Sequence, residues 1–162
     1  MVGTERVFVG LGANLGDALF TVRVALTDLA GLPRSTLVAH SALYRSAPVD
    51  AAGPDFINAV GELRTELAPN ELLAALQRLE SAFGRERPYH HAPRTLDLDL
   101  LLYGRRQLSG AGLTVPHPRM HQRAFVLAPL AELAPDWVLG NGCTVAGALA
   151  GLADQRIQRI AA

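Results

Sequence analysis

The sequence predicts an α+β fold in which helices pack on an antiparallel sheet in the order βαββαβ. Three observations support this order. Short apolar stretches with a period of two, typical of strands, alternate with longer stretches that repeat every three to four residues, typical of helices. Gly or Pro separates most of these stretches. The chain has 162 residues, of which 49% are hydrophobic and 19% charged, so we expect one domain over residues 1–162 with a buried core.

The first half of the chain supplies three strands and one helix. A first strand is expected over 6–11, and it ends at Gly10-Leu11-Gly12. The helix over 17–30 carries a single apolar face, formed by Leu19, Val22, Leu26 and Leu29. Strands over 36–46 and 55–67 follow, because Ala47-Pro48 closes one apolar stretch and Gly53-Pro54 opens the next.

A second helix and a fourth strand complete the expected core. Pro69 suits the first position of a helix over 69–83, and Glu71 suits its first turn. A strand over 95–103 comes next. A turn over 104–112, a loop rich in Pro and His over 115–121, and helices near 124–133 and 144–152 then follow. This order is the split βαβ, or ferredoxin-like, arrangement with extra C-terminal helices.

The strand over 95–103 carries the residues with the clearest chemistry. Its leucines alternate with Asp97 and Asp99, so both carboxylates face one side, about 6–7 Å apart at Cα. Two such carboxylates repel each other, and Mg²⁺, which prefers carboxylate oxygens, would compensate. Arg94 adds a fork that binds phosphate. The group predicts metal-assisted phosphate chemistry, with a solvent-facing polar stripe on an edge strand as the alternative.

Composition excludes several classes of function. The formal net charge of zero argues against a general nucleic-acid binder. All 15 basic residues are Arg, so no mechanism that needs a Walker-A or Schiff-base lysine is possible. The single Cys143 excludes an internal disulfide. No apolar run approaches the ~20 residues of a membrane span, and residues 1–6 do not resemble a signal peptide, so we expect a cytoplasmic protein without membrane contact.

Four further motifs allow two interpretations each. Leu15 stands where a dinucleotide fingerprint needs Gly, so residues 10–16 suggest a tight turn that lines a ligand, or a purely structural turn. The Arg- and His-rich stretch 85–94 is an active-site lid or a solvated loop. His117 and His121 lack a third ligand for zinc, which leaves a structural role or phosphate contact for His117. Finally, Phe56 with Asn58 and Phe125 with Arg123 are each two residues apart, so on a strand each pair would face one side. The two phenylalanines would sandwich a flat heterocycle or fill the core.

Several of these segments, in one order over about residues 7–136, together resemble the 6-hydroxymethyl-7,8-dihydropterin pyrophosphokinase family of the folate pathway. The segment Pro93-Arg94-Thr95-Leu96-Asp97-Leu98-Asp99 is highly specific to that family. The others are weaker alone: Gly12-Ala13-Asn14-Leu15-Gly16, Tyr44-Arg45-Ser46-Ala47-Pro48-Val49, Phe56-Ile57-Asn58-Ala59-Val60, Gln77-Arg78-Leu79-Glu80, Gly84-Arg85 and Val115-Pro116-His117-Pro118.

The resemblance implies an enzyme that moves the β,γ-pyrophosphoryl group of ATP to the pterin hydroxymethyl oxygen and releases AMP. Asp97 and Asp99 would hold two Mg²⁺ ions, and together with Arg85 and Arg94 they would form the catalytic set. Other residues would bind ATP: Gln77, Glu80, Arg85, His91, Arg94, Leu100, His117 and Arg123. The pterin would contact Ala47, Val49, Phe56, Asn58 and Phe125. ATP and 6-hydroxymethyl-7,8-dihydropterin are then the expected partners, and we expect a monomer that binds no nucleic acid.

The chain departs from the family pattern in two places. His90-His91-Ala92 stands where the family has a basic residue, an aromatic residue and Gly, and Ser46-Ala47-Pro48 stands where Thr-Pro-Pro is common. We hypothesise that His90 replaces a permanent cation. A histidine with a pKa of about 6.5 is mostly neutral above pH 7. ATP affinity should therefore fall from pH 6 to pH 8 more than in a His90→Arg variant, and equal slopes would contradict the hypothesis.

Two other classes of protein compete with this interpretation. A non-catalytic ferredoxin-like domain that binds a small ligand and regulates a partner explains the fold but not the Asp pair beside Arg94. A metal-dependent nucleotide hydrolase would use Asp97, Asp99, His117 and His121, and it would release phosphate without an acceptor.

Overall fold

An antiparallel sheet with helices on both faces forms the centre of the protein. The computed structural model describes residues 3–47, 53–83, 96–110 and 112–160. Within these residues the main sheet has six strands, namely β1 (Glu5–Ala13), β2 (Ser35–His40), β3 (Leu43–Ser46), β4 (Phe56–Thr65), β5 (Asp97–Tyr103) and β8 (Ile157–Ile160). Their order is β5-β1-β4-β3-β8, and β2 also pairs with β4. The antiparallel ferredoxin-like core is therefore confirmed.

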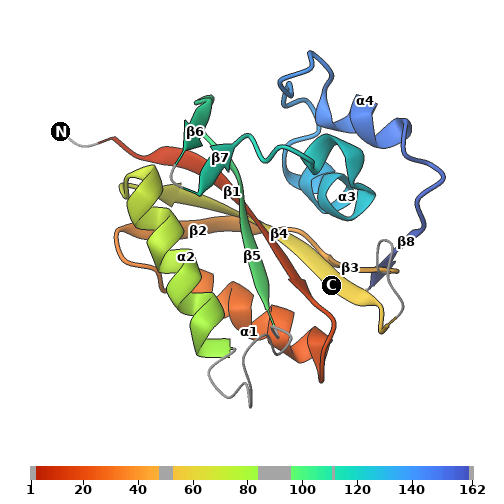
Figure 1. Ribbon diagram of the computed structural model, residues 1–162, viewed down its shortest axis with the longest axis horizontal. Helices are drawn as coiled ribbons and strands as arrows, with labels where there is room; N and C mark the ends of the chain where they lie inside the picture. The colour runs from red at the N-terminus through yellow and green to blue at the C-terminus, as the bar shows by residue number, and fades with distance from the viewer. Residues whose placement is uncertain (1–2, 48–52, 84–95, 111, 161–162) are drawn as a thin grey trace.

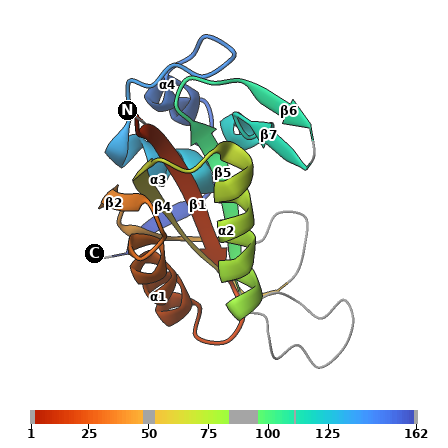
Figure 2. The ribbon, with the colours of Figure 1, turned by 90° about the vertical axis from the view of Figure 1, so that its left-hand side faces the viewer.

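Four α-helices cover the two faces of the sheet. Figures 1 and 2 show α1 (Ala18–Ala30) and α2 (Pro69–Phe83) on one face, with α3 (Ala124–Leu133) and α4 (Val145–Ala150) on the other. A small hairpin of β6 (Leu108–Gly110) and β7 (Leu113–Val115) and a short 3₁₀ helix η1 (Met120–Gln122) connect β5 to α3. None of the described helices is long and apolar enough to cross a membrane.

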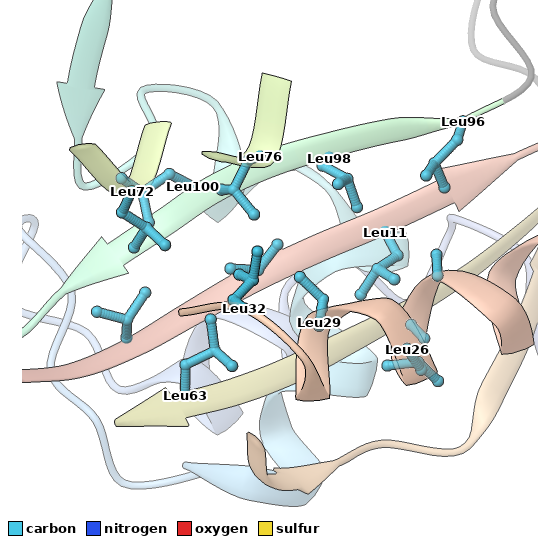
Figure 3. Close-up of a cluster of buried hydrophobic side chains, with 14 of the residues drawn as sticks. Leu11, Leu26, Leu29, Leu32, Leu63, Leu72, Leu76, Leu96, Leu98 and Leu100 are labelled. Atoms are coloured by element: carbon cyan, nitrogen blue, oxygen red, sulfur yellow. The ribbon is translucent and has the colours of Figure 1, made fainter. Parts of the chain in front are cut away.

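Alternation along the strands divides the core into two clusters. Val7, Val9 and Leu11 of β1 point toward α1 and α2, where leucines from both helices and from β5 bury them (Figure 3). Phe8 of the same strand points the other way and packs with Leu127 of α3 and with Trp137. Burying apolar surface on both faces is the main favourable term in folding, so β1 is held firmly between two helical layers.

The structure corrects several expected boundaries. β1 continues through Gly12 to Ala13 instead of ending at Leu11. The expected strand 36–46 is two strands, because the Ser41 hydroxyl accepts a hydrogen bond from Val60 N–H at 3.0 Å and so interrupts the backbone ladder. Residues 104–112, expected as a turn, include strand β6. Strand β8 was not expected from the sequence. The helices expected over 69–83 and 124–133 are confirmed to the residue.

Candidate active site

Asp97 and Asp99 project from one face of β5, as expected from their spacing. Both are exposed, whereas Leu98 and Leu100 on the opposite face are buried against α2. β5 pairs on one side with β1. At its other edge, Leu98 N–H donates to Glu80 Oε2 of α2 at 2.8 Å. This contact fixes α2 against the strand that carries both carboxylates.

Glycines on β1 leave open space beside the two carboxylates. Gly12 pairs with Asp97 on one side and with Asn58 of β4 on the other, and Gly10 pairs with Asp99 in the same way. Directly paired residues of an antiparallel sheet point to the same face. The row Asn58, Gly12, Asp97 therefore lacks a side chain at its centre. The sequence suggested that these glycines form a turn, but they are the floor of a pocket within a strand.

A pocket of about 260 Å³ lies over this floor. Three of its features match the proposed chemistry: two carboxylates, one guanidinium and two aromatic rings. The expected site residues that line it are Ala47, Phe56, Asn58, Asp97, Asp99, Arg123 and Phe125. They come from β3, β4, β5 and α3 and the residues next to them. The pocket thus brings together most of the pterin set with the carboxylate pair.

Ser46 orients the amide of Asn58, a role that the sequence did not reveal. The Asn58 side chain is 4% exposed, and its Nδ2 donates to Ser46 Oγ at 2.7 Å. Its Oδ1 lies toward Gly12, where an added Cβ would be 3.4 Å away. The amide therefore presents an acceptor to the pocket. No local signal marks this contact in the sequence, because Ser46 and Asn58 lie 12 residues apart, on β3 and β4.

Arg123 and Phe125 lie at the start of α3, in agreement with the helix expected near 124–133, so they do not face one side of a strand. Arg123 is the N-cap residue of α3, and Phe125 lies in its first turn. The Arg123 guanidinium carbon is 5.5 Å from the centroid of the Phe125 ring, in the range of a cation–π contact. Both side chains line the pocket from the helical layer that faces the sheet.

His117 is half-buried and lies close enough to Asp99 to sense its charge. Burial lowers the pKa of His117, the Asp99 carboxylate opposes that effect, and Arg123 and Arg119 add to it. The ring Nδ1 accepts a hydrogen bond from Arg119 N–H at 3.3 Å. An imidazole whose Nδ1 accepts a hydrogen bond carries its N–H at Nε2. His117 lines a separate cavity of about 430 Å³ with Thr114 and His121.

The remaining expected nucleotide residues differ in their surroundings. Gln77 is exposed on α2, and Glu80 is half-buried beside β5. The Leu100 side chain is buried in the core (Figure 3), so it has only its backbone to offer a ligand. Four of the expected site residues lie outside the described residues, namely Val49, Arg85, His91 and Arg94, and so does His90.

The carboxylate pair suits Mg²⁺ better than zinc. In the described part of the chain, no group of three or more His, Cys, Asp or Glu side chains is arranged to hold a metal. Zinc sites normally need three or four such ligands. Mg²⁺, in contrast, is commonly bound by one or two carboxylates together with substrate phosphates and water. Asp97 and Asp99 therefore fit a cation that arrives with a phosphorylated substrate.

Comparison with known proteins identifies relatives over nearly the whole chain. Residues 8–135 match the family model described as 7,8-dihydro-6-hydroxymethylpterin-pyrophosphokinase (HPPK). A protein of Pseudomonas aeruginosa named 2-amino-4-hydroxy-6-hydroxymethyldihydropteridine pyrophosphokinase is 46% identical over 157 residues, covering 96% of this chain and 97% of the relative. A Synechocystis protein of the same name is 49% identical over 130 residues, covering 80% of this chain and 67% of the relative.

Solved structures share the fold at low sequence identity. A crystal structure of HPPK-DHPS in complex with substrates superposes with a TM-score of 0.76 and 9% identity, covering 94% of this chain and 44% of that chain. Wild-type HPPK-DHPS of Plasmodium falciparum gives a TM-score of 0.71 and 12% identity, covering 93% and 41%. The chain thus spans less than half the length of these solved proteins.

Proposed function

The chain belongs to the 7,8-dihydro-6-hydroxymethylpterin-pyrophosphokinase family, and we propose that it transfers the pyrophosphoryl group of ATP to 6-hydroxymethyl-7,8-dihydropterin in folate biosynthesis. The observation that carries this proposal is the pocket in which Asp97 and Asp99 stand beside Asn58 and two aromatic side chains. A phosphate-binding cation and a flat heterocycle can both be accommodated there. A hydrolase or a regulatory module needs no such combination.

The pocket supports a specific mode of binding for the pterin. Phe56 and Phe125 would hold the flat ring between their faces, since aromatic rings stack favourably. Asn58 Oδ1 would accept a hydrogen bond from a ring N–H or amino group, because the contact of Nδ2 with Ser46 Oγ turns the amide so that Oδ1 lies toward Gly12. Ala47 and Val49 would contact the edge of the ring.

The carboxylates serve the phosphates and the attacking hydroxyl. Asp97 and Asp99 would hold two Mg²⁺ ions, and bound Mg²⁺ supplies neutralisation of phosphate charge. The hydroxymethyl oxygen bonds to the β-phosphorus while the bond from that phosphorus to the α-phosphate oxygen breaks, so AMP leaves. Asp97 or Asp99 would accept the hydroxyl proton. Phosphoryl transfer depends on positioning and charge more than on covalent catalysis.

The cations and polar groups around this centre would bind ATP. Arg85 and Arg94 would stabilise charge on the transferring group, because a guanidinium pairs with two phosphate oxygens at once. The rest of the proposed nucleotide site comprises Gln77, Glu80, His91, Leu100, His117 and Arg123. His117, whose pKa is lowered chiefly by burial and whose Nδ1 accepts from Arg119 N–H, is suited to donate a hydrogen bond from Nε2.

One assay tests the proposal and its rivals. The protein is incubated with ATP, Mg²⁺ and 6-hydroxymethyl-7,8-dihydropterin, and AMP is measured with and without the pterin. We expect AMP that depends on the pterin, and an Asp97→Ala variant that loses at least about a hundredfold in kcat, as is typical when charge stabilisation at a transition state is removed. Asp136→Ala is the matched control, because Asp136 is exposed and lies outside the pocket.

Each alternative has its own outcome. Phosphate or AMP that forms equally without pterin would favour a nucleotide hydrolase. No turnover, with pterin binding intact, would favour a binding module. Full activity of Asp97→Ala would remove Asp97 from the metal site, whatever the reaction.

A further inference from the structure

The start of α3 carries two residues of the proposed site but has no cap of its own. Arg123, the N-cap residue, has an extended backbone (φ −124°, ψ 106°) and makes no side-chain capping hydrogen bond. The first N–H groups of a helix lack acceptors within the helix, so they need a partner from elsewhere. Ala124 N–H is such a group, and it lies between Arg123 and Phe125.

Gln155, far along the chain, supplies that partner and a second contact. Its Oε1 accepts from Ala124 N–H at 2.9 Å, and its Nε2 donates to the Gln122 carbonyl at 2.8 Å. The two contacts lie on either side of Arg123 in the chain. One amide side chain therefore binds the backbone on both sides of Arg123 and fixes the segment from which Arg123 and Phe125 project.

Packing holds the backbone of this segment but leaves two side chains next to open space. Ala124 and Val126 are buried in the core, whereas Arg123 and Phe125 line the 260 Å³ pocket and a second cavity of about 550 Å³ that Gln155 also lines. Side chains next to open space have fewer neighbouring atoms to resist movement. Hydrogen bonds from Gln155 are directional, so they supply the restraint that packing leaves incomplete.

Gln155 is itself tied to the sheet. Its backbone N–H donates to the Leu152 carbonyl at 2.9 Å. Two residues later, β8 begins and pairs with β3 in the register Ser46 with Ile157. Ser46 is the residue that orients Asn58. The C-terminal segment thus connects the helical wall of the pocket to the strand wall.

We propose that Gln155 is a positioning residue that holds Arg123 and Phe125 in place for substrate binding. The expected effect on substrate binding rests on the proposed function, whereas the two hydrogen bonds of Gln155 do not depend on it. Gln155 does not line the 260 Å³ pocket; it acts through the backbone on both sides of Arg123. Its loss should weaken binding of the pterin and of ATP while the carboxylate centre on β5 keeps its chemistry.

The test separates KM from kcat. A tenfold change in binding corresponds to about 1.4 kcal/mol, which is less than the total of about 2 kcal/mol expected for two hydrogen bonds. We expect Gln155→Ala to raise the KM for pterin about tenfold with kcat within about twofold of wild type. Gln158→Ala, an exposed glutamine on β8 outside both cavities, is the matched control and should keep both constants. An unchanged KM in Gln155→Ala overturns the proposal.

A second variant and a second readout keep the test decisive. Gln155→Glu keeps an acceptor for Ala124 N–H but loses the donor to Gln122, so its KM should lie between wild type and Gln155→Ala. Amide hydrogen exchange at Ala124, which needs no activity, should accelerate at least about fivefold in Gln155→Ala and not in Gln158→Ala. An unchanged exchange rate at Ala124 would show that the two hydrogen bonds of Gln155 do not restrain this backbone. Absence of pterin-dependent AMP in the wild type would instead overturn the proposed function.

Discussion

Gly10 and Gly12 of β1 leave space for a ligand, and their backbone conformation does not require glycine. Neither Gly10 nor Gly12 has a positive φ. A Cβ at Gly12 would lie 3.4 Å from Asn58 Oδ1 and 3.9 Å from Phe56 Cδ1, which is ordinary contact distance. A methyl group is therefore tolerated by the fold, but it occupies the floor of the pocket where a ligand would lie.

Gly12→Ala should separate binding from stability. We expect the KM for pterin to rise about tenfold, while the free energy of unfolding changes by less than about 0.5 kcal/mol, as is usual for a substitution that creates no clash. Gly3→Ala, with nothing within 4 Å of its added Cβ, is the control. Steady-state kinetics and urea unfolding give the two quantities. A loss of stability with unchanged KM would show that Gly12 serves the strand and not the site.

The residue scale also shows what spacing alone can predict. Asp97 and Asp99 share a face because the side-chain period of a strand is two, and that period is visible in the sequence. The same spacing has no such meaning for Arg123 and Phe125, because these residues begin the helix expected near 124–133. Ser46 and Gln155 were missed because each acts through a partner at a distance, 12 residues away for Ser46 and 31 or 33 for Gln155.

At the scale of elements, one carboxylate joins α3 to the strands beside the pocket. Glu132, in the last turn of α3, accepts hydrogen bonds from the Tyr44 hydroxyl and from Ala42 N–H. Its Oε2 also lies 3.7 Å from Arg159 Nε of β8. α3 is thus fixed at its start by Gln155 and near its end by Glu132, which sets its position over β3.

This junction makes a prediction about alkaline pH. Burial, then the hydrogen bond and charge of Glu132, raise the pKa of Tyr44 to about 12 from its ordinary value of 10.0. Below pH 10 the phenol is protonated in both folded and unfolded states, and its contribution to stability is fully present. Between pH 10 and 12 only the unfolded state loses the proton, so the stability of the wild type falls, by at most about 1.4 kcal/mol per pH unit.

Tyr44→Phe should reduce that dependence. We expect the variant to be less stable than wild type at pH 8, by about 1 kcal/mol for the lost hydrogen bond, with the difference narrowing as the pH rises from 10 to 11. Urea unfolding at pH 8, 10 and 11 measures it. Tyr103, whose pKa is also raised by burial, is present in both proteins and contributes equally. Parallel slopes in the two proteins would contradict the assignment of the shift to Tyr44.

Element boundaries were predictable where side chains set them. The helix over 69–83 follows from its apolar stripe, and β5 follows from its alternation. β8 has only four residues and is held as a strand by its pairing with β3. A segment of this length is too short for its alternation of apolar and polar residues to predict a strand. The division between β2 and β3 depends on where the Ser41 hydroxyl meets Val60 N–H, a contact that only the folded sheet creates.

At the scale of the whole molecule, the site is formed where the sheet meets α3. The carboxylates come from the edge strand, the glycine floor from the next strand, and one aromatic wall from a helix on the far side of the sheet from α1 and α2 (Figures 1 and 2). The ferredoxin-like order was predictable from sequence periodicity. The pocket was expected from the family resemblance and not from periodicity, because Phe56 and Phe125 line one pocket only when α3 packs on the sheet.

The most direct test of the central claim follows the phosphorus atoms of ATP by ³¹P nuclear magnetic resonance during turnover with 6-hydroxymethyl-7,8-dihydropterin. Pyrophosphoryl transfer predicts AMP together with a pterin product whose two phosphorus signals are coupled, appearing at equal rates and only when pterin is present. ADP with a singly phosphorylated pterin, or free phosphate or pyrophosphate without pterin, would contradict the assignment of Asp97, Asp99 and the aromatic pocket to one transfer reaction.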